Sequence, residues 1–195
     1  MKNWSFKRWN TLLGWLVFAI SFITYLSTIE PNFSFWACGE YISSAIKLQV
    51  THAPGAALFQ LVGAVFAMFA FGNPDHYSVV INAMSSLFSA FTILFLFWTI
   101  THLVRRMFHK EFTEVTKGEE ITILFAGLVG ALCFAFSDSF WFSAVEGEVY
   151  SMASLFIALI LWLVTKWENE YQAADNERWI ILIFFIVGLS IGVHM

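Results

Sequence analysis

The chain is poor in charged residues, which make up only 12% of its 195 residues. Soluble domains carry about 25% charged residues, so an ordinary soluble domain is excluded. Net charge is only −4, and no basic block is long enough to bind nucleic acid, so we expect no nucleic-acid partner. With 3 prolines and 11 glycines, the composition also excludes a collagen-like repeat.

Cysteine is scarce as well, and the 2 cysteines cannot build a disulfide framework. Cys38 lies in a polar-aromatic segment and Cys133 in an apolar run, so we expect two unpaired thiols. The sequence also lacks the P-loop, G-x-G-x-x-G, H-E-x-x-H and G-x-S-x-G motifs, which excludes the enzyme classes that depend on them.

Hydrophobic residues are abundant at 59%, aromatic residues reach 19%, and the mean hydropathy is +0.72. A helix needs about 20 apolar residues to cross a bilayer, with about 17 as the lower limit. The sequence therefore predicts an all-α, multi-pass helical membrane protein. Six stretches without Asp, Glu, Lys or Arg reach or approach that length: 9–29, 48–74, 76–104, 121–137, 149–165 and 179–195.

The distribution of basic residues selects one topology among these stretches. If all six cross with the N-terminus inside, most basic residues fall outside, against the positive-inside rule. If residues 48–74 lie along the outer surface instead, every Lys and Arg except Lys47 becomes cytoplasmic. Pro54 and several small residues in this stretch also favour close packing over a crossing. We therefore expect a cytoplasmic N-terminus, a first outer loop over 30–76, and five crossings over 11–28, 78–104, 121–137, 149–165 and 179–195.

This topology places two groups of acidic residues on the same side of the membrane. Glu40 lies in the first outer loop, whereas Asp138, Glu146 and Glu148 lie in the second. Acidic groups beside apolar helices often mark a functional site. A structural interpretation stays open, in which they occupy the first turns or caps of helices. Glu146 and Glu148 can reach one ligand only if their segment is extended or just entering a helix.

Aromatic and basic residues accompany these carboxylates. Trp36 and Trp141 fit an interfacial aromatic belt, and they equally fit stacking on the apolar face of a sugar ring. His52 is a candidate contact for a phosphate, and a plain structural role for it stays open.

The sequence resembles a large family of multi-pass membrane proteins that is abundant in Bacteroidetes-type bacteria. The animal relatives of that family are protein O-mannosyltransferases. The family pattern Trp-Asp-Cys-Gly-Glu, followed by His-Pro-Pro-Gly, is similar to residues 36–40 and 52–55. Residues 138–150 resemble its second signature, and residues 188–194, which end at His194, resemble a further family segment.

The resemblance implies a GT-C glycosyltransferase fold with its active site in the first outer loop. Such enzymes transfer a sugar from a polyprenyl-phosphate-type lipid donor, here to a protein hydroxyl on the outer face, with inversion at the anomeric carbon. By resemblance, Glu40 and Asp138 are the candidate catalytic residues. The metal is not specified, although a divalent cation is a candidate cofactor, and the expected location is a bacterial inner membrane. Candidate substrate-binding residues are Trp36, His52, Trp141, Glu146 and Glu148.

The sequence departs from the family pattern at two positions. Ala37 stands where the family has Asp, and Ala53 replaces the first Pro of the turn. The chain also ends at Met195 inside a predicted crossing, so we expect residues 1–195 to be the N-terminal part of one transmembrane domain. Two other functions stay open: an ion- or proton-coupled transporter that uses the same carboxylates, and a non-catalytic membrane assembly subunit.

Overall fold

The computed structural model describes residues 2–108, 115–170, 172 and 175–193. Within these ranges the chain is helical and contains no β-strand, which confirms the all-α prediction. The α-helices are α1 (Lys2–Ser27), α2 (Cys38–Lys47), α3 (Ala57–Ala67), α4 (Tyr77–Met107), α5 (Lys117–Ala135), α6 (Asp138–Ala144), α7 (Val149–Glu170) and α8 (Glu177–Ser190). Two 3₁₀ turns, η1 (Met68–Ala70) and η2 (Pro74–His76), join α3 to α4.

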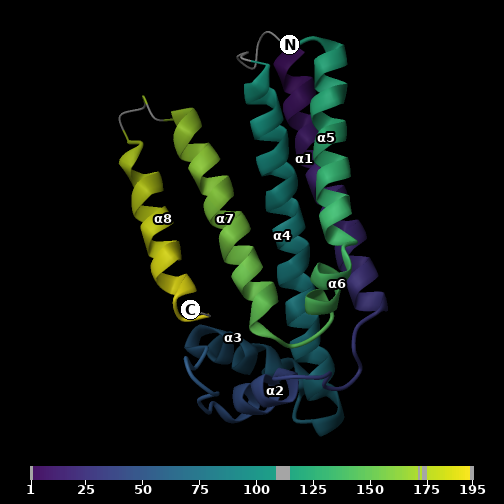
Figure 1. Cartoon of the computed structure of the whole chain (residues 1–195), viewed down its shortest axis with the longest axis vertical. Coiled ribbons are helices and arrows are strands. Elements are labelled where there is room, and N and C mark those ends of the chain that lie inside the picture. The colour runs from purple at the N-terminus through teal and green to yellow at the C-terminus, as the bar shows by residue number, and fades with distance from the viewer. Residues whose placement is uncertain (1, 109–114, 171, 173–174, 194–195) are drawn as a thin grey trace.

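Four helical segments are long and apolar enough to cross a membrane: Phe6–Ser27, Pro74–Met107, Lys117–Ala135 and Val149–Glu170. They correspond to α1, α4, α5 and α7, which run side by side as a bundle, with α8 beside α7 (Figure 1). The multi-pass helical prediction is therefore confirmed. Helix α8 covers most of the fifth predicted crossing with 14 residues, about 21 Å of helix, and His194 lies outside the described residues.

The stretch predicted not to cross forms a short helix at one end of the bundle. Its apolar helical part runs over Ala57–Ala70, too short to span a hydrocarbon core of about 30 Å. Helices α2 and α3 lie across the bundle end instead of along it (Figure 1). A Cβ atom added to Gly63 of α3 would lie 2.9 Å from the Cβ atom of Ala45 in α2. The small residues therefore allow the close packing that the sequence predicted.

The start points of two spanning helices follow from local capping. The Asn73 side chain accepts a hydrogen bond from the Asp75 backbone N–H at 3.1 Å, and Pro74 occupies the first position of the turn that leads into α4. At the opposite end of the bundle, Thr116 and Glu119 form a reciprocal capping box that begins α5. Polar residues thus fix where the apolar segments start.

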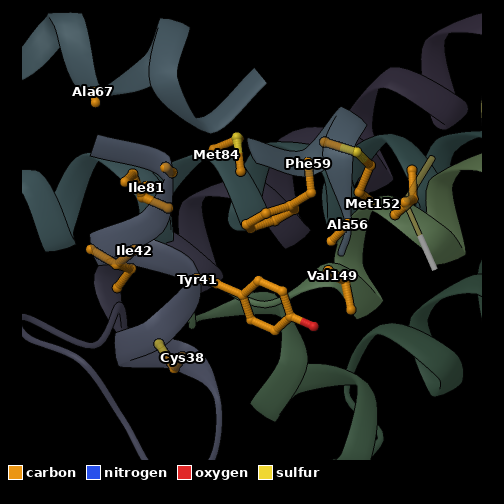
Figure 2. Packing of buried hydrophobic residues seen from close by; sticks show 12 residues of the cluster. Cys38, Tyr41, Ile42, Ala56, Phe59, Ala67, Ile81, Met84, Val149 and Met152 are labelled. Atoms are coloured by element: carbon orange, nitrogen blue, oxygen red, sulfur yellow. The ribbon is translucent and has the colours of Figure 1, made fainter. Parts of the chain in front are cut away.

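A buried apolar cluster holds the crosswise helices against the bundle (Figure 2). Tyr41 of α2 and Phe59 of α3 meet with their ring centroids 5.5 Å apart. Met84 of α4 and Met152 of α7 pack in the same cluster from the bundle side. Burying large apolar side chains contributes about 1.5–3 kcal/mol each, so this cluster fixes the position of the loop that carries Glu40.

The two ends of the bundle differ in chemical character. The loop after α1 and the segment after α6 meet at one end, where the Glu30 backbone N–H donates to the Val145 carbonyl at 3.2 Å. The N-terminus, the end of α4 and the start of α5 lie at the other end (Figure 1). The end where these segments meet, called the acidic end below, therefore contains both signature segments, and its location on the outer side stays a prediction. The basic residues at the opposite end are Lys7, Arg8, Arg105, Arg106, Lys117, Lys166 and Arg178.

Candidate active site

The best-defined polar contact at the acidic end joins Glu40 to His52. Glu40 lies in the first turn of α2, and its Oε1 atom accepts a hydrogen bond from the His52 backbone N–H at 2.6 Å. Its Oε2 atom lies 2.9 Å from the Nδ1 atom of His52. The structural interpretation of Glu40 as a first-turn residue is confirmed, and the structure adds a specific partner from the first-loop signature.

The contact with His52 also sets the protonation of Glu40. The backbone hydrogen bond from His52 is the main cause that holds the pKa of Glu40 below its ordinary value of 4.5, and the imidazole adds to it. Both side chains remain exposed to solvent. Glu40 is therefore an accessible carboxylate that stays ionised at neutral pH.

The return of the chain from α2 to His52 depends on an unusual backbone conformation. Leu48 ends α2 in the left-handed region, with φ 50° and ψ 46°, and its N–H reaches the carbonyl groups at the end of the helix. The Gln49 N–H donates to the Ser44 carbonyl at 2.8 Å, which completes the turn. This turn folds residues 49–52 back toward the start of α2.

The second signature contributes two carboxylates that are almost completely buried. Glu146 is 2% exposed and Glu148 is 4% exposed. They lie in the non-helical segment that joins α6 to α7, just before Val149. Because this segment is not part of a regular helix, both side chains can reach one region. The Ser34 hydroxyl donates a hydrogen bond to Glu146 Oε2, which links the second loop to the first.

Burial changes the acidity of these two groups in the opposite direction to Glu40. It raises the pKa of Glu146 and that of Glu148 above 4.5, since ionised carboxylates are poorly solvated there. The hydrogen bond from the Ala37 backbone N–H acts on the pKa of Glu148 in the opposing direction, and an electrostatic interaction with His52 adds to it, so Glu148 and His52 lie in one electrostatic neighbourhood. Carboxylates with oppositely shifted pKa values in one region are typical of acid–base sites.

Several buried polar groups at this end have no hydrogen-bond partner in the described part of the chain. They include the Thr51 hydroxyl, both polar atoms of the Gln60 amide, Asn82 Oδ1 and Glu148 Oε1. Buried polar groups in native proteins are nearly always hydrogen-bonded, so these atoms are candidates for contact with a ligand.

Two residues that sequence reasoning missed hold the loops in place. Asn82 of α4 is fully buried, and its Nδ2 atom donates to the carbonyl oxygens of Glu30 and Asn32 at 2.7 and 2.8 Å. In the sequence, the indication for this role of Asn82 is that it is the one amide side chain within the apolar stretch 76–104. Ser34, which bonds Glu146, carries no comparable signal in the sequence.

Among the described residues, the other predicted site residues form no hydrogen bond or ion pair with the Glu40–His52 pair. Trp36 is 90% exposed with φ 61°. Trp141 donates from Nε1 to the Thr28 hydroxyl at 3.0 Å and packs on Tyr25. Asp138 is exposed in the first turn of α6, and no hydrogen bond or ion pair joins it to Glu40 in the described residues. The functional roles of these three residues stay predictions, as do those of Glu40, His52, Glu146 and Glu148.

The two cysteines are free, as expected: Cys38 is buried and Cys133 is exposed. Burial raises the pKa of the Cys38 thiol, so it packs in the core as a neutral group. Across the described residues, no group of three His, Cys, Asp or Glu side chains is placed to hold a metal ion.

The two signature segments meet at one end of a helical membrane bundle. The residues that contain them match the model of a known protein family. A family model described as the protein O-mannosyl-transferase TMEM260 N-terminal domain matches residues 37–195. The chain belongs to this family. The matched residues of the TMEM260 N-terminal domain include Glu40, His52 and all three carboxylates of the second loop.

Two curated relatives share this similarity. Protein O-mannosyl-transferase tmem260 of Dictyostelium discoideum is 28% identical over 164 residues, which cover 84% of this chain and 18% of the relative. Protein O-mannosyl-transferase TMEM260 of Mus musculus is 27% identical over 176 residues, which cover 90% of this chain and 22% of the relative. The chain thus spans about a fifth of the length of these relatives. No solved structure matches it.

Proposed function

We propose that this chain forms the N-terminal part of a membrane-embedded protein O-mannosyltransferase of the inverting GT-C type. The observation that carries the proposal is the Glu40–His52 pair, which joins the two halves of the first-loop signature at 2.9 Å within the residues that the family matches. The printed names of the Dictyostelium and mouse relatives support the reaction class.

The proposed reaction moves a mannosyl group from a polyprenyl-phosphate-type lipid donor to a protein hydroxyl. The ionised Glu40 carboxylate accepts the hydroxyl proton as the acceptor oxygen attacks the anomeric carbon. The bond between that carbon and the phosphate oxygen breaks, and its electron pair leaves with the lipid phosphate. His52 holds Glu40 in place, and its imidazole is proposed to bind the departing phosphate.

The second loop shapes the opposite wall of this proposed site. Glu148 lies in the same electrostatic neighbourhood as His52 and has an unpartnered Oε1 atom in the described structure. A buried carboxyl group with a raised pKa can retain a proton and donate a hydrogen bond to a sugar hydroxyl. Glu148 and Gln60 are therefore proposed to bind the sugar, and Asp138 is kept as a candidate contact for the acceptor.

The proposed orientation places this site on the outer face of a bacterial inner membrane, with the N-terminus in the cytoplasm. The support is the positive-inside rule, because the basic residues other than Lys47 are confined to the opposite end or its connecting loop. Membrane lipids surround the bundle, and the protein acceptor reaches the site from the aqueous side.

The test is an assay of the full-length protein that contains this chain, reconstituted in liposomes with polyprenyl-phosphate mannose and an acceptor peptide. We expect Glu40→Gln to reduce release of polyprenyl phosphate by about 10²–10⁴-fold, the range for loss of a general base. Glu177→Gln is the matched control, because Glu177 also lies in the first turn of a helix but at the other end of the bundle. Full transfer by Glu40→Gln would remove the catalytic assignment.

The departure at position 37 provides a second test. Ala37 immediately precedes α2, and its backbone N–H lies beside the Glu148 carboxylate. Ala37→Asp restores the family residue at the centre of the proposed site, and we expect it to increase the transfer rate. If wild-type and Ala37→Asp proteins both bind donor and neither releases polyprenyl phosphate, the chain is a non-catalytic member of the family.

A further inference from the structure

A cavity lies at the basic end of the bundle, opposite the candidate active site. It has a volume of about 520 Å³ and is formed by α1, α4 and α7. Ligand sites in proteins commonly fall between about 300 and 1,000 Å³. The cavity contains neither signature segment, so the proposed transferase reaction does not account for it.

Three cations from three different helices line this cavity: Lys7 of α1, Arg105 of α4 and Lys166 of α7. Arg105 is only 4% exposed, although it lies at the end of a spanning helix where an arginine could reach water. Lys7 and Lys166 are close enough for their charges to repel each other. Holding like charges together is unfavourable, and an anion between them removes that repulsion.

Two carboxylates nearby interact with cations of the cavity, Glu170 with Lys166 and Glu168 with Arg105, but each is also bound by further groups. Glu170 lines the cavity, but its Oε2 atom accepts hydrogen bonds from Arg178 at 3.0 Å and from the Trp179 indole at 2.8 Å. Glu168 accepts from His102 Nε2 at 2.8 Å and from Arg106. Positive charge therefore exceeds negative charge in the cavity wall.

The rest of the wall is amphipathic. Trp98 and Trp162 lie with their ring centroids 5.8 Å apart, and the Lys166 ammonium lies 4.9 Å from the Trp162 centroid. Asn10 and Asn169 add amide groups. A cationic wall beside indole rings suits a phosphate head group whose apolar part contacts the rings.

From this combination we infer that the cavity between α1, α4 and α7 binds a phosphate group, either on a membrane lipid or as a free anion. Lys7, Arg105 and Lys166 contact the phosphate, and the two indoles contact the adjoining apolar part. The chemistry is that of a phosphate mono- or diester at the basic end of the bundle, a second site separate from the proposed transfer site.

The test measures lipid retention by native mass spectrometry of the full chain in neutral detergent. The probes are dioleoyl phosphatidic acid, dioleoyl phosphatidylcholine and inorganic phosphate. We expect the double variant Lys7→Gln/Lys166→Gln to weaken phosphatidic acid binding by about thirtyfold, roughly fivefold for each cation removed. The matched control is Arg8→Gln/Lys117→Gln, which removes the same charge from the same end without altering the cavity wall, and we expect less than a twofold effect.

A third variant keeps every charge and fills the space. Thr11 lines the cavity from α1, so Thr11→Phe should block the ligand and reduce binding at unchanged net charge, even if the double variant fails to fold. If inorganic phosphate binds with the same dependence on Lys7 and Lys166 and the lipids do not bind, the result supports the site. The ligand is then a free phosphate anion. Equal weakening by both double variants, or unchanged binding by Thr11→Phe, would overturn the proposal.

Discussion

Replacing Asn82 tests how the two signature segments are held together. Its Nδ2 atom donates to the carbonyl oxygens of Glu30 and Asn32, and the neighbouring Glu30 N–H donates to Val145 in the second segment. Asn82→Leu keeps the branched shape and removes both donors. We expect the first loop to separate more readily from the second, while the apolar bundle stays folded.

The magnitude follows from the number of hydrogen bonds lost. Each contributes about 1 kcal/mol net, and both acceptor carbonyls belong to residues near water, which can replace part of the loss. The local opening free energy should therefore fall by about 2 kcal/mol, and amide exchange at residues 29–34 should accelerate by about thirtyfold.

Hydrogen exchange followed by mass spectrometry measures this effect directly. Ser89→Ala is the control, because Ser89 is also fully buried in α4 but its hydroxyl has no hydrogen-bond partner in the described structure. We expect that control to leave exchange at residues 29–34 unchanged. Unaltered exchange in Asn82→Leu, or equal acceleration in both variants, would refute the reasoning.

Further predictions concern packing and pH. Gly147→Ala places a Cβ atom 3.0 Å from Asn82 Oδ1, so it should lower the free energy of unfolding by about 1–3 kcal/mol. Gly188→Ala has open space around the new Cβ atom, so it should raise the free energy of unfolding by about 0.5–1 kcal/mol. Thermal unfolding of both variants checks these two expectations. Because burial raises the pKa of Glu148, its ionisation opposes folding as pH rises above 4.5, so Glu148→Gln should raise Tm at pH 7 and lose that gain by pH 4.5. The pKa of Glu40 is lowered instead, so its ionisation stabilises the fold. This stabilisation is present above pH 4.5 and is lost as pH falls through the folded pKa, so Glu40→Gln should lower Tm at pH 7 only.

The sequence predicted the helical bundle well because bilayer crossing is determined by features that are local and additive. Segment length, charge depletion and the location of basic residues are each visible along the chain, and the location of basic residues predicted that residues 48–74 do not cross. The structure confirms that their apolar helix is short. Helix α8 was harder to judge, because Glu177 and Arg178 occupy its first turn and the helix ends at Ser190.

The candidate site was only partly predictable, because its contacts depend on tertiary packing. The signature pattern identified Glu40 and His52 as candidates, but their direct contact depends on the left-handed residue Leu48, which turns the chain back. Glu146 and Glu148 are separated by about 200° on a regular helix, and only the non-helical segment before Val149 lets both face the buried junction. No periodicity in the sequence predicts the Ser34–Glu146 contact.

The proposed site requires that the two signature segments share one aqueous side of the membrane, opposite the basic end. Single cysteines at Ser43 and Ser139, both exposed at the acidic end, and at Lys117, at the basic end, test this in intact cells once Cys38 and Cys133 are replaced by alanine. With a membrane-impermeant maleimide, we predict labelling of positions 43 and 139 in intact cells and of position 117 only after permeabilisation. Labelling of position 117 in intact cells, with 43 or 139 protected until permeabilisation, would contradict the account.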